Sequence, residues 1–173
     1  MYTDDAIAGE AAALAIGLIM VGSGSKDSQA IEDLVTYAHD THHEKIVRAI
    51  AMSLAMIVYG TEQNADTLIE QLSREKDPIL RYGAMYCIGL AYAGTANNNA
   101  FRKLIKFSVS DGSDDVRRAA LINIGFLHIK NPEVLLENLK VLSLLSESYN
   151  PQVRYDLIFY VIFLILDTEQ LWP

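Results

Sequence analysis

Hydrophobic and polar positions along the chain follow the spacing of amphipathic helices. Apolar side chains recur at intervals of three and four residues in the stretches that begin at Ile31, Ala65 and Phe101, which places them on one helical face. No stretch alternates with the period of two that is typical of a strand. The pattern therefore predicts helices only, at about 4–21, 27–39, 43–59, 62–74, 78–93, 98–110, 114–129, 132–147 and 151–167.

Local signals mark the predicted helix ends. An Asp-Pro or Asn-Pro pair predicts an N-cap side chain followed by proline at the first helical position, at Asp77, Asn131 and Asn150. A glycine after the last apolar residue predicts a left-handed residue beyond the helix, at Gly22, Gly60 and Gly94.

Every second predicted helix begins with a similar string, and we call these the anchor helices and those between them the outer helices. The aligned anchor positions are Gly9, Arg48, Arg81, Arg117 and Arg154, which are 39, 33, 36 and 37 residues apart. Eight residues later, three of these helices carry a further glycine, at Gly17, Gly89 and Gly125. A period in this range is typical of two-helix repeats. The chain is therefore predicted to be an all-α, right-handed solenoid of HEAT-like repeats.

The anchor helices are rich in alanine and glycine. Although glycine inside a helix costs about 1 kcal/mol relative to alanine, small residues at matching positions allow neighbouring helix axes to approach closely. We therefore expect the anchor helices to stack tightly on one another.

Composition and charge exclude or disfavour several classes of protein. The 173 residues are 51% hydrophobic with a formal net charge of −8, which excludes a disordered chain and disfavours a nucleic-acid surface. The longest uncharged stretch, 11–25, is too short to span a bilayer. Cys87 is the single cysteine, so no intramolecular disulfide forms, as suits a reducing compartment. We expect a soluble, acidic, intracellular protein.

Candidate catalytic and metal-binding patterns are weak. His39, His42 and His43 lie close together, but a break between helices is expected inside the cluster and no cysteine is near. The glycines at 22 and 24 lack the full phosphate-loop motif and follow a helix rather than a strand. Cys87 lies in a small-residue helix, where a buried inert thiol is expected. No cofactor, metal or catalytic set is predicted.

Charged residues suggest a structural role and one candidate surface. Acids precede the arginines of the anchor helices by four residues at Glu44, Asp77 and Asp114, a spacing that supports a helix. A structural role for these arginines is favoured over binding of an acidic partner, because similar charges recur in each repeat. Candidate contacts for basic partner helices are the acidic residues Asp111, Asp114, Asp115, Glu62 and Glu70.

Several strings resemble one known family. The Gly/Ala-rich helices resemble the proteasome/cyclosome repeat, and longer strings resemble the larger non-ATPase scaffold subunits in the base of the proteasome regulatory particle. These strings begin at Asp4, His43, Asp77, Ser110 and Leu144 and include Ser-Asp-Asp-Val-Arg-Arg-Ala-Ala and Ser-Glu-Ser-Tyr-Asn-Pro-Gln-Val-Arg-Tyr. The resemblance extends from about residue 1 to residue 155.

The resemblance implies an arc from the centre of a ring-like toroid with a scaffold role and no catalysis. It implies binding to proteasomal ATPase and non-ATPase subunits, contacts with ubiquitin or ubiquitin-like proteins, and a location in the cytoplasm and nucleus. The alternatives are the sibling scaffold subunit, the large cyclosome subunit, and a generic HEAT-type adaptor. Helical-repeat enzymes and DNA-repair proteins form a different class, but they would need convergent acid–base residues or a basic groove, and the sequence shows neither.

The last segment departs from the family pattern. After Tyr155 the Gly/Ala-rich pattern is replaced by a run of bulky apolar residues, Leu157–Leu166, and a short polar end. We therefore expect a repeat solenoid over 1–155 and an atypical hydrophobic helix over 156–173 that is not homologous. The open ends of a solenoid expose apolar faces, which predicts self-association.

Overall fold

Helices form along the chain nearly as the hydrophobic pattern predicts. The structure is a computed structural model that describes residues 5–24 and 28–131 and the single positions 133, 134, 138, 151, 154 and 155. Within these residues it contains helices and turns and no strand. The elements are α1 (Ala6–Ile19), α2 (Ser28–Asp40), α3 (Glu44–Ile57), the 3-10 helix η2 (Glu62–Ala65), α4 (Asp66–Ser73), α5 (Pro78–Ala91), α6 (Asn98–Ser110) and α7 (Asp114–His128).

The start of α5 confirms the predicted Asp77 cap, whereas the Asn131 side chain donates to the Gly94 carbonyl oxygen at 2.9 Å and Asn150 lies outside the described residues. Asp77 Oδ1 accepts a hydrogen bond from the Ile79 backbone N–H at 2.8 Å, and Pro78 is the first residue of α5. The Asn97 side chain accepts from the N–H groups of Asn99 and Ala100. These side chains satisfy donors that have no partner inside the helix. The two predicted helices at 132–147 and 151–167 lie outside the continuously described ranges.

Three anchor helices end two residues before their predicted ends. The α1, α3 and α5 helices end at residues 19, 57 and 91, whereas the apolar pattern continues to 21, 59 and 93. The extra residues form the turn before Gly22, Gly60 and Gly94, whose φ angles are 72°, 68° and 71°. The predicted left-handed glycines are therefore confirmed.

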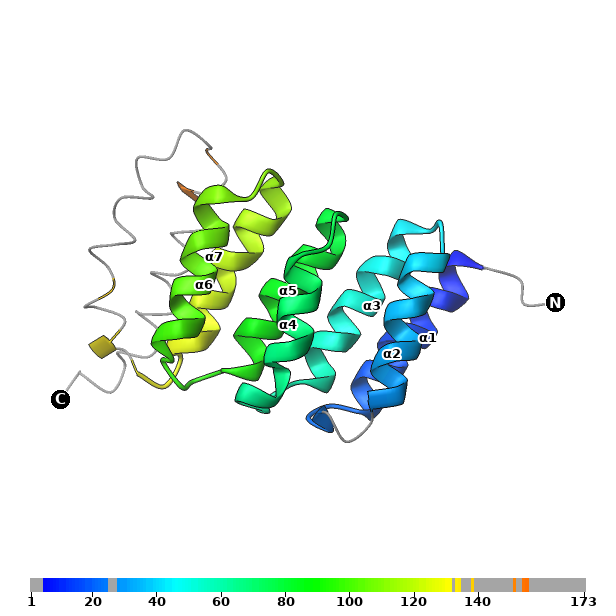
Figure 1. Cartoon of the computed structure of the whole chain (residues 1–173), viewed down its shortest axis with the longest axis horizontal. Coiled ribbons are helices and arrows are strands. Elements are labelled where there is room, and N and C mark those ends of the chain that lie inside the picture. The colour runs from blue at the N-terminus through cyan, green and yellow to red at the C-terminus, as the bar shows by residue number, and fades with distance from the viewer. Residues whose placement is uncertain are drawn as a thin grey trace. The chain divides into compact units, whose positions relative to one another are not determined.

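The chain falls into two compact units, Met1–Ala91 and Tyr92–Pro173. In the first unit α1 packs on α3 and α3 packs on α5, while the outer helices α2 and α4 pack on α3 and α5 (Figure 1). In the second unit the outer helix α6 packs on α7. Each outer helix thus pairs with the anchor helix that follows it in sequence, which is the two-helix repeat that the spacing predicts. Fully buried side chains on these helices include Ile50, Leu54, Ile69, Leu80, Met85, Leu104 and Ile124.

Backbone hydrogen bonds connect the turn after an anchor helix to a carbonyl near the end of a later anchor helix. The N–H of the turn glycine donates to a carbonyl near the end of the following anchor helix in three places: Gly22 to Met56 at 3.1 Å, Gly60 to Leu90 at 3.1 Å and Gly94 to Phe126 at 3.0 Å. Each bond satisfies a helix-terminal carbonyl that has no partner inside its own helix. We call this recurring contact the turn ladder.

The turn has a second left-handed residue two positions after each glycine. Gly24, Glu62 and Ala96 have φ angles of 61°, 48° and 51°. The glycines at 22 and 24 therefore belong to the same turn as the Gly60 and Gly94 segments. This recurrence gives the Gly22–Gly24 loop a structural explanation that needs no bound phosphate.

Small residues bring the anchor helices of the first unit into close contact. A Cβ on Gly83 of α5 would lie 2.7 Å from the Ala51 Cβ of α3. The buried Ser53 hydroxyl on α3 donates to the Ala13 carbonyl oxygen of α1 at 2.6 Å. A side-chain hydrogen bond to a helix carbonyl in the neighbouring repeat requires such a short separation. The predicted tight stacking is therefore present among α1, α3 and α5.

Candidate partner-binding surfaces

The anchor arginines fasten the turns that precede their helices. Arg81 Nη1 donates to the carbonyl oxygens of Glu75 at 2.9 Å and Lys76 at 2.8 Å. Arg117 makes the equivalent bond to the Asp111 carbonyl at 2.7 Å. Both arginines thus reach back six residues to the end of the preceding outer helix. Charge-assisted bonds of this kind hold the turn between the two helices of a repeat.

The other anchor positions lie in three different settings. The Arg48 guanidinium lies over the Tyr82 ring, 5.4 Å from its centroid, and so joins α3 to α5 by a cation–π contact. A Cβ on Gly9 would meet the Ile46 side chain, and one on Gly17 would meet the Ser53 backbone. The remaining glycine positions, Gly89 and Gly125, are buried in α5 and α7, and Arg154 is exposed.

The predicted acidic contacts are partly engaged within the protein. Asp111 Oδ1 accepts from the Ser113 N–H at 2.8 Å, and Asp114 pairs with Arg117. The exposed side chains of Glu70 and Arg74 lie 3.5 Å apart at α4, and Glu62 begins η2. Asp115 is exposed in the first turn of α7. The three aspartates lie together at the start of α7, but the two glutamates belong to the other unit, so a single acidic surface of all five is not shown.

The histidine cluster and Cys87 show no arrangement typical of metal binding or of a nucleophilic thiol in the described part of the chain. The break between α2 and α3 falls inside the histidine cluster, as predicted, and His39 Nε2 lies 3.5 Å from Glu75 Oε1. In the described part of the chain no three His, Cys, Asp or Glu side chains are grouped so that they could hold a metal. Burial raises the pKa of the Cys87 thiol to about 12, so the reactive thiolate is disfavoured.

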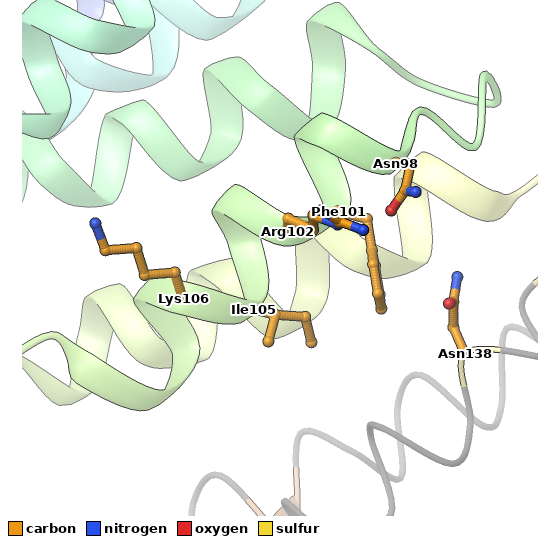
Figure 2. Close-up of a pocket in the computed structure, with 6 residues that line it drawn as sticks. All are labelled: Asn98, Phe101, Arg102, Ile105, Lys106 and Asn138. Carbon is orange, nitrogen blue, oxygen red and sulfur yellow. The ribbon is translucent and has the colours of Figure 1, made fainter.

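A pocket beside α6 in the second unit is a candidate surface that none of the sequence motifs predicts. The pocket has a volume of about 490 Å³ and is lined by Asn98, Phe101, Arg102, Ile105, Lys106 and Asn138. Figure 2 shows Phe101 and Ile105 pointing from α6 toward the side on which Asn138 lies. A signal was present in the sequence, because the range 98–110 carries three basic residues and no acid in an acidic chain.

A buried histidine supports the inner wall of this pocket. The ring of His128 meets the Phe101 ring edge-on, with centroids 5.5 Å apart. His128 Nδ1 lies 2.9 Å from the Ile124 carbonyl oxygen, so this nitrogen carries the proton and donates. Nε2 is then the acceptor for the Asn138 amide N–H at 3.2 Å. Burial lowers the pKa of His128, while the bond to Ile124 opposes that shift.

An exposed apolar face lies on α1. Ile7, Leu18 and Ile19 are 75%, 66% and 84% exposed, whereas Ala13 and Gly17 on the other side of the helix are buried against α3. The predicted self-association stays a prediction, and this face is the place to test it. In the described residues no helix is both long and apolar enough to cross a membrane.

Comparison with known proteins confirms the family resemblance. Residues 11–47 match the proteasome/cyclosome repeat. Over 155 residues, which is 90% of this chain, it is 53% identical to 26S proteasome non-ATPase regulatory subunit 1 homolog A of Arabidopsis thaliana. It is 50% identical to the Drosophila melanogaster subunit 1 and 46% identical to regulatory subunit rpn2 of Schizosaccharomyces pombe over the same length. The chain spans only about 15% of the length of these relatives.

Proposed function

We propose that this chain, which contains a proteasome/cyclosome repeat and is similar to non-ATPase regulatory subunit 1 of the 26S proteasome, serves as a non-catalytic scaffold in the proteasome regulatory particle. The observation that carries the proposal is 53% identity over 155 residues. Identity of this extent covers nearly all of the repeats and supports a shared role.

Contacts between and within the repeats are those of a rigid scaffold on which partner proteins can bind. Glycine and alanine contacts, the turn ladder and the arginine–carbonyl bonds all hold one repeat against its neighbour or close its turns. The stability of a repeat protein is approximately the sum of the stabilities of its repeats and of the interfaces between neighbouring repeats. These internal contacts leave the surfaces of the outer helices available for partners. The partners under this proposal are proteasomal ATPase and non-ATPase subunits and ubiquitin or ubiquitin-like proteins, in the cytoplasm and nucleus.

Affinity purification of the tagged chain from Arabidopsis thaliana cells, followed by mass spectrometry, tests the proposal. We expect proteasomal ATPase and non-ATPase subunits to be enriched over a tag-only control. Asp115→Lys tests the acidic start of α7. Reduced recovery of proteasomal subunits with unchanged helicity would assign Asp115 to a contact with a partner protein. Gly83→Leu would force the α3 and α5 backbones apart. This variant tests whether recovery of the proteasomal subunits requires correctly packed repeats. Recovery of chaperones without proteasomal subunits would contradict the proposed scaffold role.

A further inference from the structure

The outer helices α4 and α6 carry different charges at matching positions. Ile69 and Leu72 are among the buried positions of α4, and Phe101 and Leu104 are among the buried positions of α6. Aligning the helices on these residues places Glu70 at the position of Arg102 and Arg74 at the position of Lys106. In α4 the two side chains form an ion pair at 3.5 Å.

In α6 the same two positions are both positive. Arg102 and Lys106 are exposed and four residues apart, and like charges at this spacing destabilise an isolated helix by a few tenths of a kcal/mol. Neither side chain forms an ion pair in the part of the chain that the structure describes. Among the described residues, therefore, no carboxylate pairs with these two cations.

The two cations flank the pocket beside α6. Its wall contains the aromatic ring of Phe101 and the half-buried side chain of Ile105, with the amides of Asn98 and Asn138 around them. The volume of about 490 Å³ is large enough for a bulky side chain. In Figure 2 the Lys106 side chain extends away from Asn138, and its flexible stem allows the ammonium to move to a bound carboxylate.

We propose that this pocket binds an acidic segment of a partner protein, whose carboxylates pair with Arg102 and Lys106 while an apolar side chain enters between Phe101, Ile105 and Asn138. An acidic peptide fits better than a nucleic acid, because the whole chain has a net charge of −8 and would repel an extended phosphate backbone. This inference goes beyond the scaffold proposal, since the pocket can recognise such a segment whether or not the chain docks on the proteasome.

Fluorescence anisotropy with the full chain and a labelled peptide tests the inference. The probe is a short peptide in which Asp and Glu flank a single Phe. One comparison peptide has Asn and Gln in place of the acids, and another has Ser in place of Phe. We expect both comparison peptides to bind more weakly than the probe. Equal binding of the uncharged peptide, or the absence of binding by the acidic one, would overturn the proposal.

Charge-reversal variants locate the site. Lys106→Glu should weaken binding about tenfold, because it removes one attraction and adds one repulsion. It should not lower the melting temperature, since it creates an Arg–Glu pair at the favourable spacing. Lys45→Glu makes the same change in net charge at an exposed side chain of α3 that does not line the pocket, and should alter binding by less than about twofold if its charge is screened by salt.

Two further measurements decide between a pocket and a general charge effect. Ile105→Ser should weaken the Phe-containing probe more than the Ser-containing peptide, because only the former uses the apolar wall. Equal effects of Lys106→Glu and Lys45→Glu would refute the assigned site. Tighter binding of a single-stranded RNA oligonucleotide than of the acidic peptide would also refute it, in favour of a polyanion surface.

Discussion

The Cα of Gly17 lies against the backbone of Ser53, so that a Cβ at position 17 would stand 2.6 Å from the Ser53 Cα. The atom in the way belongs to the main chain of α3, which can move only if the two helices separate. This differs from Gly9 on the same helix, where a Cβ would lie 2.5 Å from the terminal Cδ1 of Ile46.

Gly17→Ala should therefore destabilise the first unit, and Gly9→Ala should not. Overpacking against a fixed backbone costs about 1–3 kcal/mol, which exceeds the gain of about 1 kcal/mol from better helix propensity. At position 9 the obstructing atoms belong to the buried Ile46 side chain, which can shift more readily than a backbone, and the gain in helix propensity offsets that adjustment, so the change in unfolding free energy should stay within about 0.5 kcal/mol of zero. Urea unfolding of both variants checks this, and equal destabilisation would show that the backbone contact has no special effect.

Glu62 and Ala96 occupy left-handed positions that glycine occupies in the equivalent turn at Gly24. Because a non-glycine residue is disfavoured there by about 1–2 kcal/mol, Glu62→Gly and Ala96→Gly should each raise the unfolding free energy by roughly 0.5–1 kcal/mol after the greater unfolded-state freedom of glycine is included. Gly24→Ala is the reverse change and should destabilise. Chemical denaturation of the three variants provides the measurement, and a loss of stability in Glu62→Gly would contradict the expectation.

Cys87 should resist modification in the folded protein. The thiol is fully buried and its pKa is raised to about 12 by that burial, so both access and thiolate formation are unfavourable at neutral pH. Mass spectrometry after iodoacetamide treatment should show no adduct under native conditions and complete labelling in denaturant. Rapid labelling without denaturant would mean that α5 opens readily.

His128 should make stability fall as the solution becomes acidic. Burial lowers its folded-state pKa below the ordinary value of 6.5, so the unfolded chain takes up a proton first as the pH decreases. The contribution of this group is complete above pH 6.5 and is lost progressively between 6.5 and the folded-state pKa.

Thermal unfolding across this pH range checks the effect. We expect His128→Gln to show a shallower decline than the wild type between pH 6.5 and 5, because it has no imidazole to protonate. His42→Gln, which removes an exposed imidazole between α2 and α3, should keep the wild-type slope. Identical slopes for the wild type and His128→Gln would show that other groups control the acid sensitivity.

Much of the fold could be predicted from local signals. The helix ranges, the Asp77 cap and the left-handed glycines depend on residues close in sequence, and the structure confirms the helices up to α7, this cap and these glycines. The ends of the anchor helices were placed two residues too late, because turn residues such as Val58 remain apolar and buried. Periodicity alone does not separate a buried turn from the last helical turn.

The pocket beside α6 could not be predicted from such local signals. It requires His128, Phe101 and Asn138 to meet, and these residues come from three segments separated by up to 37 positions. The basic residues on 98–110 were visible in the sequence, but the contrast between Arg102 and Lys106 and the Glu70–Arg74 pair became clear only when α6 was compared with α4. The role of Arg81 as a partner of backbone carbonyls likewise depends on the turn geometry.

The turn ladder is made entirely by main-chain atoms, from a glycine N–H to a helix-terminal carbonyl. Replacement of the carbonyl-bearing residue changes a side chain and leaves its oxygen in place, so Met56, Leu90 and Phe126 need not resemble one another. An insertion or deletion inside an anchor helix, in contrast, would shift the carbonyl by about 100° around the helix axis. The repeats are therefore free to diverge in amino-acid identity but are constrained in length along the anchor helices, so that differences in repeat length must be absorbed by the outer helices and turns.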